Sequence, residues 1–366
     1  MSTKKSATIV NVAKAAGVSV ATASRVLSNS DYPISPAMRS KVLKAAKSLN
    51  YSPNLLGRML KSANTKSLGI IIPSFQNPFY TQLIMGIEQK AFQIGYSTFV
   101  FSSLRDPSIE RRLISQLSSM RISGLLLSSI DSNSQALDLY LESGGSACVF
   151  EADFPLDNRV INASSDMLEV GRMATEYLLS LGHTSIALLT TPLRKRSRMQ
   201  IVDGYQLAMM KAGHSNSMDD VFIVPFERES DDGLYEYEAG ISLANLLLGS
   251  EKKYTAAVVV NDQLACGVLH GLTTANVRVP EDISLVSVDN IPLSAVVTPS
   301  LTTVDQFARQ LGQNACQLLV DSLSSSSLSS SVRFSILPEL VIRNSACAVP
   351  SSKTQDSPQS SDTARH

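Results

Sequence analysis

Two periodicities of apolar and polar residues divide the chain into a short helical region and a longer region of alternating strands and helices. Over Thr8–Leu27, TIVNVAKAAGVSVATASRVL, small apolar residues recur at helical spacing. Thr8 and Ser19 stand where a hydroxyl can cap a helix. Gly17 stands where the chain must turn, and glycine tolerates the positive φ that such a turn requires. The pattern predicts two short helices joined by a tight turn.

A third helix is predicted after these two. Ser35 can cap it, and Pro36 occupies the first turn, where its missing N–H costs no hydrogen bond. One face of this helix is apolar and consists of Met38, Val42, Ala45, Ala46 and Leu49. The small residues Ala13 and Ala23 allow the first two helices to approach closely. The three helices favour a helix-turn-helix headpiece, whose second helix enters the major groove of DNA.

The distribution of charge supports this interpretation of the headpiece. The 366 residues include 32 basic and 32 acidic side chains, so the formal net charge is zero. Residues 1–66 hold eleven Lys or Arg and one acidic residue, a net charge of +10, whereas the remaining 300 residues hold 21 and 31, a net charge of −10. A basic headpiece on an acidic body predicts a polyanionic partner for the headpiece. A merely solvated basic segment would not need the helix-turn-helix spacing.

From Lys66 onward, short apolar runs alternate with helical stretches. The runs are 68–72, 97–101, 124–128, 147–150, 186–190, 221–224, 256–260 and 283–288. Gly95, Gly182 and Gly213 stand where helices should end. Repeated strand–helix units of this length predict an α/β body, with parallel sheets covered by helices on both faces.

The headpiece and several later segments resemble the bacterial lactose repressor/galactose repressor family of transcription factors. The matching segments are "TIVNVAKAAGVSVATASRVL", "LNYSPN", "LLGRMLKSANTKSLGIIIP", "NPFY", "LLSLGHTSIALL", "AAVVVNDQLACG", "VPEDISLVSVDN", "TPSLTTV" and "ILPELVIRNS". They follow the family's order from about Thr8 to Ser345. The resemblance implies a transcriptional repressor, without cofactor or enzymatic activity, that binds a palindromic operator in double-stranded DNA as a homodimer. It also implies a small-molecule effector, a sugar or sugar derivative, bound between two lobes.

The resemblance further implies a multi-domain organisation. Residues 1–52 form the all-α headpiece, 53–66 a hinge helix, and 67–345 a two-lobed body like a periplasmic binding protein. The first lobe is expected at about 67–163 and 293–323, and the second at about 164–292 and 330–345. The chain would then cross between the lobes near Ala163, Asn290–Ala295 and Asp321–Leu328. A Ser-rich loop (322–331) precedes a last strand, Val332–Ile342, and residues 346–366 are expected to be a disordered tail.

The resemblance to this family also implies which residues contact DNA. Val20, Ala21 and Arg25 match the base-reading positions, and the Val-Ala pair is closer to the galactose repressor. Arg25 can donate two hydrogen bonds to guanine, whereas Val20 and Ala21 offer apolar contacts. Leu60 matches the hinge leucine that inserts into the minor groove. The full expected set is Thr8, Ser19, Val20, Ala21, Thr22, Ser24, Arg25, Asn54, Arg58, Leu60 and Lys61.

Effector contacts are expected just after strand ends, at the cleft between the lobes. The expected set is Phe75, Asn77, Phe79, Tyr80, Glu151, Lys195, Ser197, Arg198, Asp262 and Asp289. Asp262 can equally be a helix N-cap. Ile201 stands where family members commonly carry an arginine that holds the ligand. The basic residues Lys195 and Arg198 suit an acidic or phosphorylated effector, although a solvated loop would explain them too.

Other classes of protein lack support in the sequence. The chain contains no GxGxxG, GxxxxGK[ST], HExxH or GxSxG motif. Its four cysteines form no CxxC pair, so a disulfide scaffold or a zinc finger is not expected, and the cysteines are expected to be buried or without a specific role. The polar, basic start and the lack of a ~20-residue apolar run predict a cytoplasmic protein without a membrane partner. A transport binding protein would share the body but not the headpiece. A ligand-independent DNA-binding regulator of the same fold remains an alternative.

Overall fold

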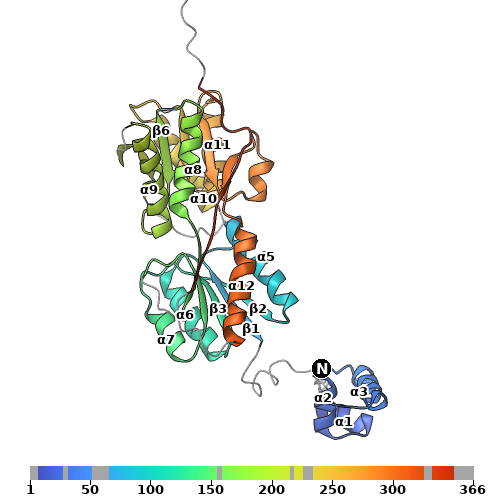
Figure 1. Cartoon of the computed structure of the whole chain (residues 1–366). Helices are drawn as coiled ribbons and strands as arrows, with labels where there is room; N and C mark the ends of the chain where they lie inside the picture. The colour runs from blue at the N-terminus through green and yellow to red at the C-terminus, as the bar shows by residue number, and fades with distance from the viewer. Residues whose placement is uncertain are drawn as a thin grey trace, which may run out of the picture. The chain divides into compact units, whose positions relative to one another are not determined.

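The computed structural model describes residues 7–27, 32–51, 66–154, 159–214, 218–225, 234–324 and 332–349. The chain divides into two compact units, Met1–Thr65 and Lys66–His366 (Figure 1). We call the first unit the headpiece and the second the body.

The described residues of the headpiece form three helices: α1 (Ile9–Ala16), α2 (Val20–Leu27) and α3 (Pro36–Ser48). Their shared core consists of Val12, Ala13, Ala23, Val26, Val42, Ala45 and Ala46. Met38 and Leu49, which we predicted on the apolar face of α3, are 41% and 36% exposed and do not belong to this core. The predicted three-helix arrangement is confirmed.

The ends of these helices follow the predicted chemistry. The Thr8 hydroxyl accepts from the Asn11 N–H, while the Asn11 carboxamide oxygen accepts from the Thr8 N–H at 2.9 Å, which makes a capping box. Gly17 ends α1 at φ +65°, so the left-handed turn is present. Ser19 caps α2 by accepting from the Thr22 N–H at 3.1 Å. Ser35 caps α3, with Pro36 in its first turn.

Two six-stranded sheets form the body. The first has the order β11-β5-β4-β3-β1-β2, and the second has the order β12-β10-β9-β8-β6-β7. Strands of the first sheet are β1 (Ser67–Ile72), β2 (Ser97–Ser102), β3 (Gly124–Ser128), β4 (Ala147–Phe150), β5 (Ile161–Ser165) and β11 (Arg333–Ile336). Those of the second are β6 (Ile186–Thr190), β7 (Val221–Ile223), β8 (Ala256–Val259), β9 (Ser284–Val288), β10 (Thr302–Asp305) and β12 (Glu339–Val341). All pairs are parallel except β10 with β12.

Helices cover both sheets and define two lobes. The first lobe carries α5 (Pro78–Gln93), α6 (Pro107–Ser119), α7 (Gln135–Glu142) and α12 (Ala308–Ser324), and Figure 1 shows α5 beside α12. The second lobe carries α8 (Met167–Ser180), α9 (Arg196–Lys211), α10 (Tyr235–Leu248) and α11 (Asp262–Thr274). Short 3-10 turns lie at Met218–Asp220 and Pro292–Ala295. The predicted runs in β1, β3, β4, β6, β8 and β9 are buried throughout, as parallel strands covered on both faces must be.

The chain crosses between the lobes at places that differ from two of our predictions. The first crossing follows β5 and lies close to the predicted Ala163. The second lies between β10 and α12, at Gln306–Phe307, because β10 pairs with β9 in the second sheet. We had assigned residues 293–305 to the first lobe, and that assignment is wrong.

The predicted last strand, Val332–Ile342, is also wrong as a single element. Residues 333–336 form β11, which pairs with β5 of the first lobe, whereas residues 339–341 form β12, which pairs with β10 of the second lobe. The third crossing therefore falls at Leu337–Pro338, later than the predicted Asp321–Leu328. Of the segment 330–345, which we assigned to the second lobe, the described residues 332–345 belong to both lobes.

The start of the predicted disordered tail is ordered. The Cys347 N–H donates to the Ser284 hydroxyl at 3.1 Å, and the Val349 N–H donates to the Leu181 carbonyl at 3.1 Å. The ring of His183, which is buried, contacts the Cys347 carbonyl at 2.9 Å. This contact fixes His183 structurally. Residues 350–366 lie outside the described residues.

Candidate DNA interface and ligand cleft

The second headpiece helix, α2, presents the predicted base-reading residues to solvent. Val20, Ala21 and Arg25 are exposed, whereas Ala23 and Val26 are buried against the other two helices. Helical spacing explains most of this division, because Ala21 and Arg25, four apart, share one face, and Ala23 and Val26, three apart, share another; Val20 is the first residue of the helix. The packing of α2 therefore leaves one face free to enter a groove.

Arg25 has a defined position on this face. Its guanidinium carbon lies 4.1 Å from the centre of the Tyr32 ring, which is a cation–π distance. Tyr32 is 53% exposed and Arg25 is exposed as well, so the ring supports the guanidinium at the surface of the headpiece. A planar guanidinium presents the paired donors that match guanine O6 and N7.

Three of the four hydroxyls predicted to contact phosphates lie at helix starts, and the fourth, that of Ser24, lies in the middle of α2. Thr8, Ser19 and Ser24 are exposed, and Thr22 is partly exposed. The Ser19 and Thr22 hydroxyls lie 2.8 Å apart at the start of α2. A helix N-terminus with exposed hydroxyls is suited to an anionic phosphate. The expected hinge contacts Asn54, Arg58, Leu60 and Lys61 lie outside the described residues.

In the body, the segment after β1 supplies the first-lobe side of the cleft. Asn77 caps α5, since its carboxamide oxygen accepts from the Phe79 N–H at 2.9 Å. Phe79 and Tyr80 contact edge to face, with ring centres 5.4 Å apart. Phe75 is 55% exposed. The segment therefore combines one fixed amide with three aromatic rings of different exposure.

Most of the predicted effector contacts lie close enough together to affect one another's pKa. Burial raises the pKa of Tyr80, and Lys195 opposes that rise most strongly, followed by Arg105 and Arg198; Glu151 adds to it. Burial also raises the pKa of Asp289 well above its ordinary value, with contributions from Asp262, Glu236 and Glu151 and opposition from Arg198. Charged groups of both lobes thus act on Tyr80 and Asp289.

Backbone strain marks the same strand ends. Glu151, Asp289 and Asn290 have positive φ values of 53°, 115° and 54°, as do Arg105 at 55° and Phe307 at 51°. Each such conformation costs a non-glycine residue of order 1–3 kcal/mol, and strain of this kind clusters at functional sites. The positions follow β4, β9, β2 and β10.

The basic segment before and within α9 is attached to the body at several points. The Arg198 side chain donates to the Thr191 hydroxyl at 3.3 Å and the Val260 carbonyl at 3.5 Å, and Ser197 is buried. The Arg196 N–H donates across the lobes to Asp153 at 2.6 Å. These contacts disfavour the alternative of a simple solvated loop. Ile201, one turn further along α9, is fully buried in the second-lobe core.

Asp262 differs from both roles that we considered. The cap of α11 is Asn261, whose side chain accepts from the Leu264 N–H at 2.7 Å. The Asp262 carboxylate is fully buried and accepts from the Ser287 and Thr303 hydroxyls and the Ile291 N–H. Burial raises its pKa to about 6. Its described partners lie in the second lobe, so Asp262 holds β9 and β10 to α11.

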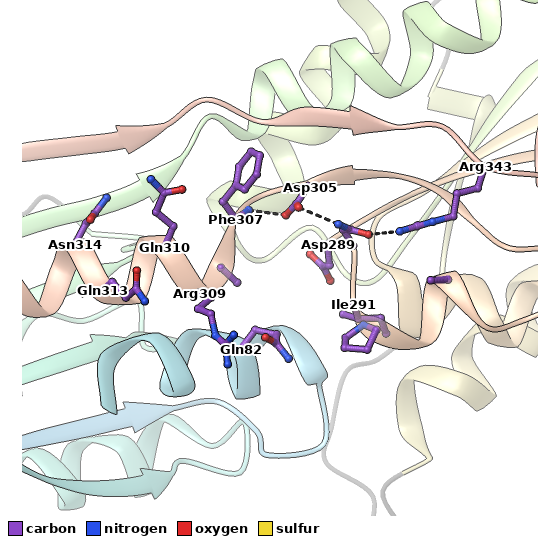
Figure 2. Close-up of a pocket in the computed structure, with 14 residues that line it drawn as sticks. Gln82, Asp289, Ile291, Asp305, Phe307, Arg309, Gln310, Gln313, Asn314 and Arg343 are labelled. Atoms are coloured by element: carbon purple, nitrogen blue, oxygen red, sulfur yellow. Dashed lines mark hydrogen bonds between the residues drawn. The ribbon is translucent and has the colours of Figure 1, made fainter. Parts of the chain in front are cut away.

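Two cavities of the body each include some of the predicted contacts. One, of about 570 Å³, includes Asp289, residues from α5 and α12, and Arg343. Figure 2 shows its hydrogen-bonded chain, in which Asn290 donates to Asp305 at 2.9 Å and accepts from Arg343 at 2.6 Å. The other, of about 650 Å³, includes Glu151 and Ser197 together with Arg196 and Arg333. Of the ten predicted contacts, Asp289 lines the first of these cavities, and Glu151 and Ser197 line the second; the other seven line neither of the two.

Sequence reasoning missed several polar residues between the lobes, namely Arg105, Tyr235, Glu236, Asn261 and Gln263. Arg105 donates to Glu236 at 3.0 Å, and its guanidinium carbon lies 5.8 Å from the centre of the Tyr235 ring. Arg105 and Asn261 could have been found, because both come shortly after apolar strands. Glu236 and Tyr235 begin a helix and carry no comparable signal.

Among the described residues, no cluster of three or more His, Cys, Asp or Glu side chains could hold a metal ion. No helix in the described part of the chain has the length and apolar character needed to cross a membrane.

Comparison with known proteins defines the class. Residues 8–54 match the family of bacterial regulatory proteins called the lacI family, and residues 175–346 match the periplasmic binding protein-like domain. The chain is 33% identical over 340 residues to the ribose operon repressor of Escherichia coli (strain K12), which covers 93% of this chain and 100% of that protein. It is 31% identical over 347 residues to the transcriptional repressor PurR of Histophilus somni (strain 2336), covering 93% and 98%.

A solved structure supports the same conclusion for the fold. The lac repressor dimer bound to operator and the anti-inducer ONPF superposes with a TM-score of 0.81 at 25% identity, covering 94% of this chain and 100% of that one. A helix-turn-helix headpiece on a two-sheet α/β body defines a DNA-binding transcriptional regulator. This chain belongs to the lacI family of bacterial regulatory proteins.

Proposed function

We propose that the chain is a repressor that binds a palindromic operator as a homodimer, through one α2 in each of two successive major grooves. The observation that carries this proposal is the exposed face of α2, where Val20, Ala21 and Arg25 stand clear of the headpiece core. The relatives are repressors, and the solved lac repressor is a dimer on its operator. Leu60 would insert at the operator centre. This role requires no catalysis, and the cytoplasm is where it is exercised.

We further propose that a small polar metabolite binds between the lobes and changes operator affinity. The proposal is supported by Phe79, Tyr80, Glu151, Lys195 and Asp289, which combine aromatic rings with both signs of charge. Carboxylates accept hydrogen bonds from sugar hydroxyls, while the cations Lys195 and Arg198 suit an acidic or phosphorylated group. Coupling between such sites is typically about 1–3 kcal/mol, or 5–150-fold in affinity.

A second candidate function is a regulator of the same fold that responds to no metabolite. Ile201 favours it, because this buried side chain offers no polar group at the position where relatives are expected to hold a ligand with arginine. Operator affinity would then be unchanged by any small molecule.

Thermal-shift screening separates the two functions. The purified chain is tested against sugars, sugar phosphates, sugar acids and nucleobases, with ribose first because of the similarity to a ribose operon repressor. A ligand at a hundred times its Kd stabilises the fold by about 2.7 kcal/mol. If an acidic or phosphorylated compound is active, Lys195→Ala should abolish its effect, while Lys211→Ala, at the far end of α9, should not. Operator binding without any shift across the panel would favour the second function.

A further inference from the structure

A single buried carboxylate, that of Glu236, joins the two lobes of the body. Glu236 lies in the first turn of α10, and its side chain is 5% exposed. One of its oxygens, Oε1, accepts from Asn77 Nδ2 at 3.1 Å and from Arg105 Nη2 at 3.0 Å, both in the first lobe. The same oxygen lies 3.3 Å from Asn261 Nδ2 of the second lobe.

The second oxygen also has a donor. In the amide orientation that satisfies its neighbours, Gln263 donates to Glu236 Oε2 at 3.0 Å and to the Gln76 carbonyl at 3.1 Å. Four donors from two lobes therefore surround one carboxylate. A set of amide and guanidinium donors of this kind is the arrangement by which proteins bind carboxylate groups.

The donors are held in place by the fold and not by Glu236 alone. Asn77 caps α5 and Asn261 caps α11, so each carboxamide oxygen is engaged by a helix N–H. Capping through the oxygen turns the nitrogen of each amide toward Glu236. The Arg105 side chain is only 7% exposed, with its guanidinium near the Tyr235 ring. Because burying such donors away from an acceptor is costly, the Glu236 carboxylate stabilises the site.

We propose that these donors form a carboxylate-binding subsite between the lobes, and that Glu236 is its tethered occupant, which holds the lobes closed without any ligand. The inference rests on the geometry of the body and not on the proposed effector. An acidic effector that uses Arg105 must displace Glu236, whereas a neutral effector can bind beside it.

Removing the carboxylate while leaving its donors tests the proposal. Glu236→Ala leaves a space for a small carboxylate, so acetate at tens of millimolar should bind in it. We expect Glu236→Ala to lower the melting temperature of the full chain and increase its radius of gyration in small-angle X-ray scattering. Sodium acetate, compared with equal sodium chloride, should partly reverse both changes. The wild-type chain should show no acetate-specific shift.

Glu238→Ala is the matched control, because Glu238 is exposed on the same helix. It should behave as wild type in both measurements. An unchanged radius of gyration in Glu236→Ala, or an equal acetate effect on the wild type, would overturn the proposal.

If Glu236→Ala does not fold, Glu236→Gln provides a milder variant, combined with Arg105→Met in a double-mutant cycle. The melting-temperature loss of the double variant should be smaller than the sum of the two single losses. Additive losses would contradict a shared subsite.

Discussion

At the scale of single residues, the sequence is most informative where one side chain has one local task. The caps Thr8, Ser19 and Ser35 and the turn at Gly17 depend only on near neighbours, and all four predictions are confirmed. Asp262 shows the opposite case. Its partners Ser287 and Thr303 are distant in sequence, so its buried role could not be read from its position before a helix.

Arg25 gives a prediction at this scale. Arg25→Ala should weaken specific operator binding by about 1–3 kcal/mol and relax the preference at one base pair, because two donors to guanine are lost. Arg25→Lys should not restore the preference, since an ammonium cannot donate in the same paired geometry. Fluorescence anisotropy with single-substitution duplexes measures both effects. Ser24→Ala is the comparison variant. Because Ser24 is predicted to contact a phosphate, its loss should weaken binding to every duplex by the same factor. If Arg25→Ala lowered the affinity for all duplexes equally, Arg25 would not read a base.

Asp262 gives a prediction about pH. Burial raises its folded-state pKa to about 6, above the ordinary value of 3.8. Well below pH 3.8 the carboxyl group is protonated in both the folded and the unfolded chain, so its raised pKa does not reduce stability. Between about pH 4 and 6 the unfolded chain loses the proton first, and the stability contributed by this group falls by up to about 1.4 kcal/mol per pH unit.

Urea unfolding of wild type and Asp262→Asn at pH 4, 5, 6 and 7 measures this contribution. The stability of wild type relative to the variant should fall from pH 4 to 6 and level off above. A difference that stays constant with pH would show that the group titrates normally.

At the scale of elements, apolar strands were predictable and polar ones were not. All eight predicted apolar runs form strands. The missed strands, β5 (INASS) and β10 (TTVD), contain few large apolar residues, although both lie in sheets. The predicted strand Val332–Ile342 was wrong because Leu337-Pro338 separates two short strands that pair with different sheets. The crossings between the lobes directly follow β5, β10 and β11, so missing or merging these strands misplaced the lobe boundaries.

Close packing of α8 against α9 gives a prediction for Gly204. A methyl group at this position would overlap the Leu168 carbonyl oxygen and approach the Arg172 nitrogen to 2.7 Å. Because both obstacles are backbone atoms, Gly204→Ala should destabilise the body by about 1–3 kcal/mol. Gly249→Ala is the control, since its new methyl would lie 3.2 Å from its nearest neighbour at an ordinary φ of −76°. Equal urea midpoints for the two variants would contradict the packing argument.

At the scale of the whole molecule, the division of charge was predictable and the contacts between the lobes were not. The +10 and −10 segments can be counted from the sequence. The contact between Glu236 and Arg105 joins residues 131 positions apart, and neither has a sequence signal that names its partner. The inter-lobe arrangement therefore depends on tertiary structure.

The charge division predicts a steep dependence of DNA binding on salt. If a dimer makes six to ten phosphate contacts, affinity should fall by about 10³–10⁵ between 50 and 200 mM salt, as counterions are released. The slope of log K against log salt, measured on one duplex, gives the number of contacts. A flat line would contradict electrostatic binding by the headpiece.

The most direct test of the central claim is selection of bound sequences from a pool of random DNA duplexes by the purified chain. We predict enrichment of one palindromic motif with two half-sites related by the symmetry of a dimer. Arg25→Ala, selected in parallel, should lose the preference at one position in each half-site. A pool that shows no enriched motif after selection, while the chain remains folded, would contradict sequence-specific operator binding.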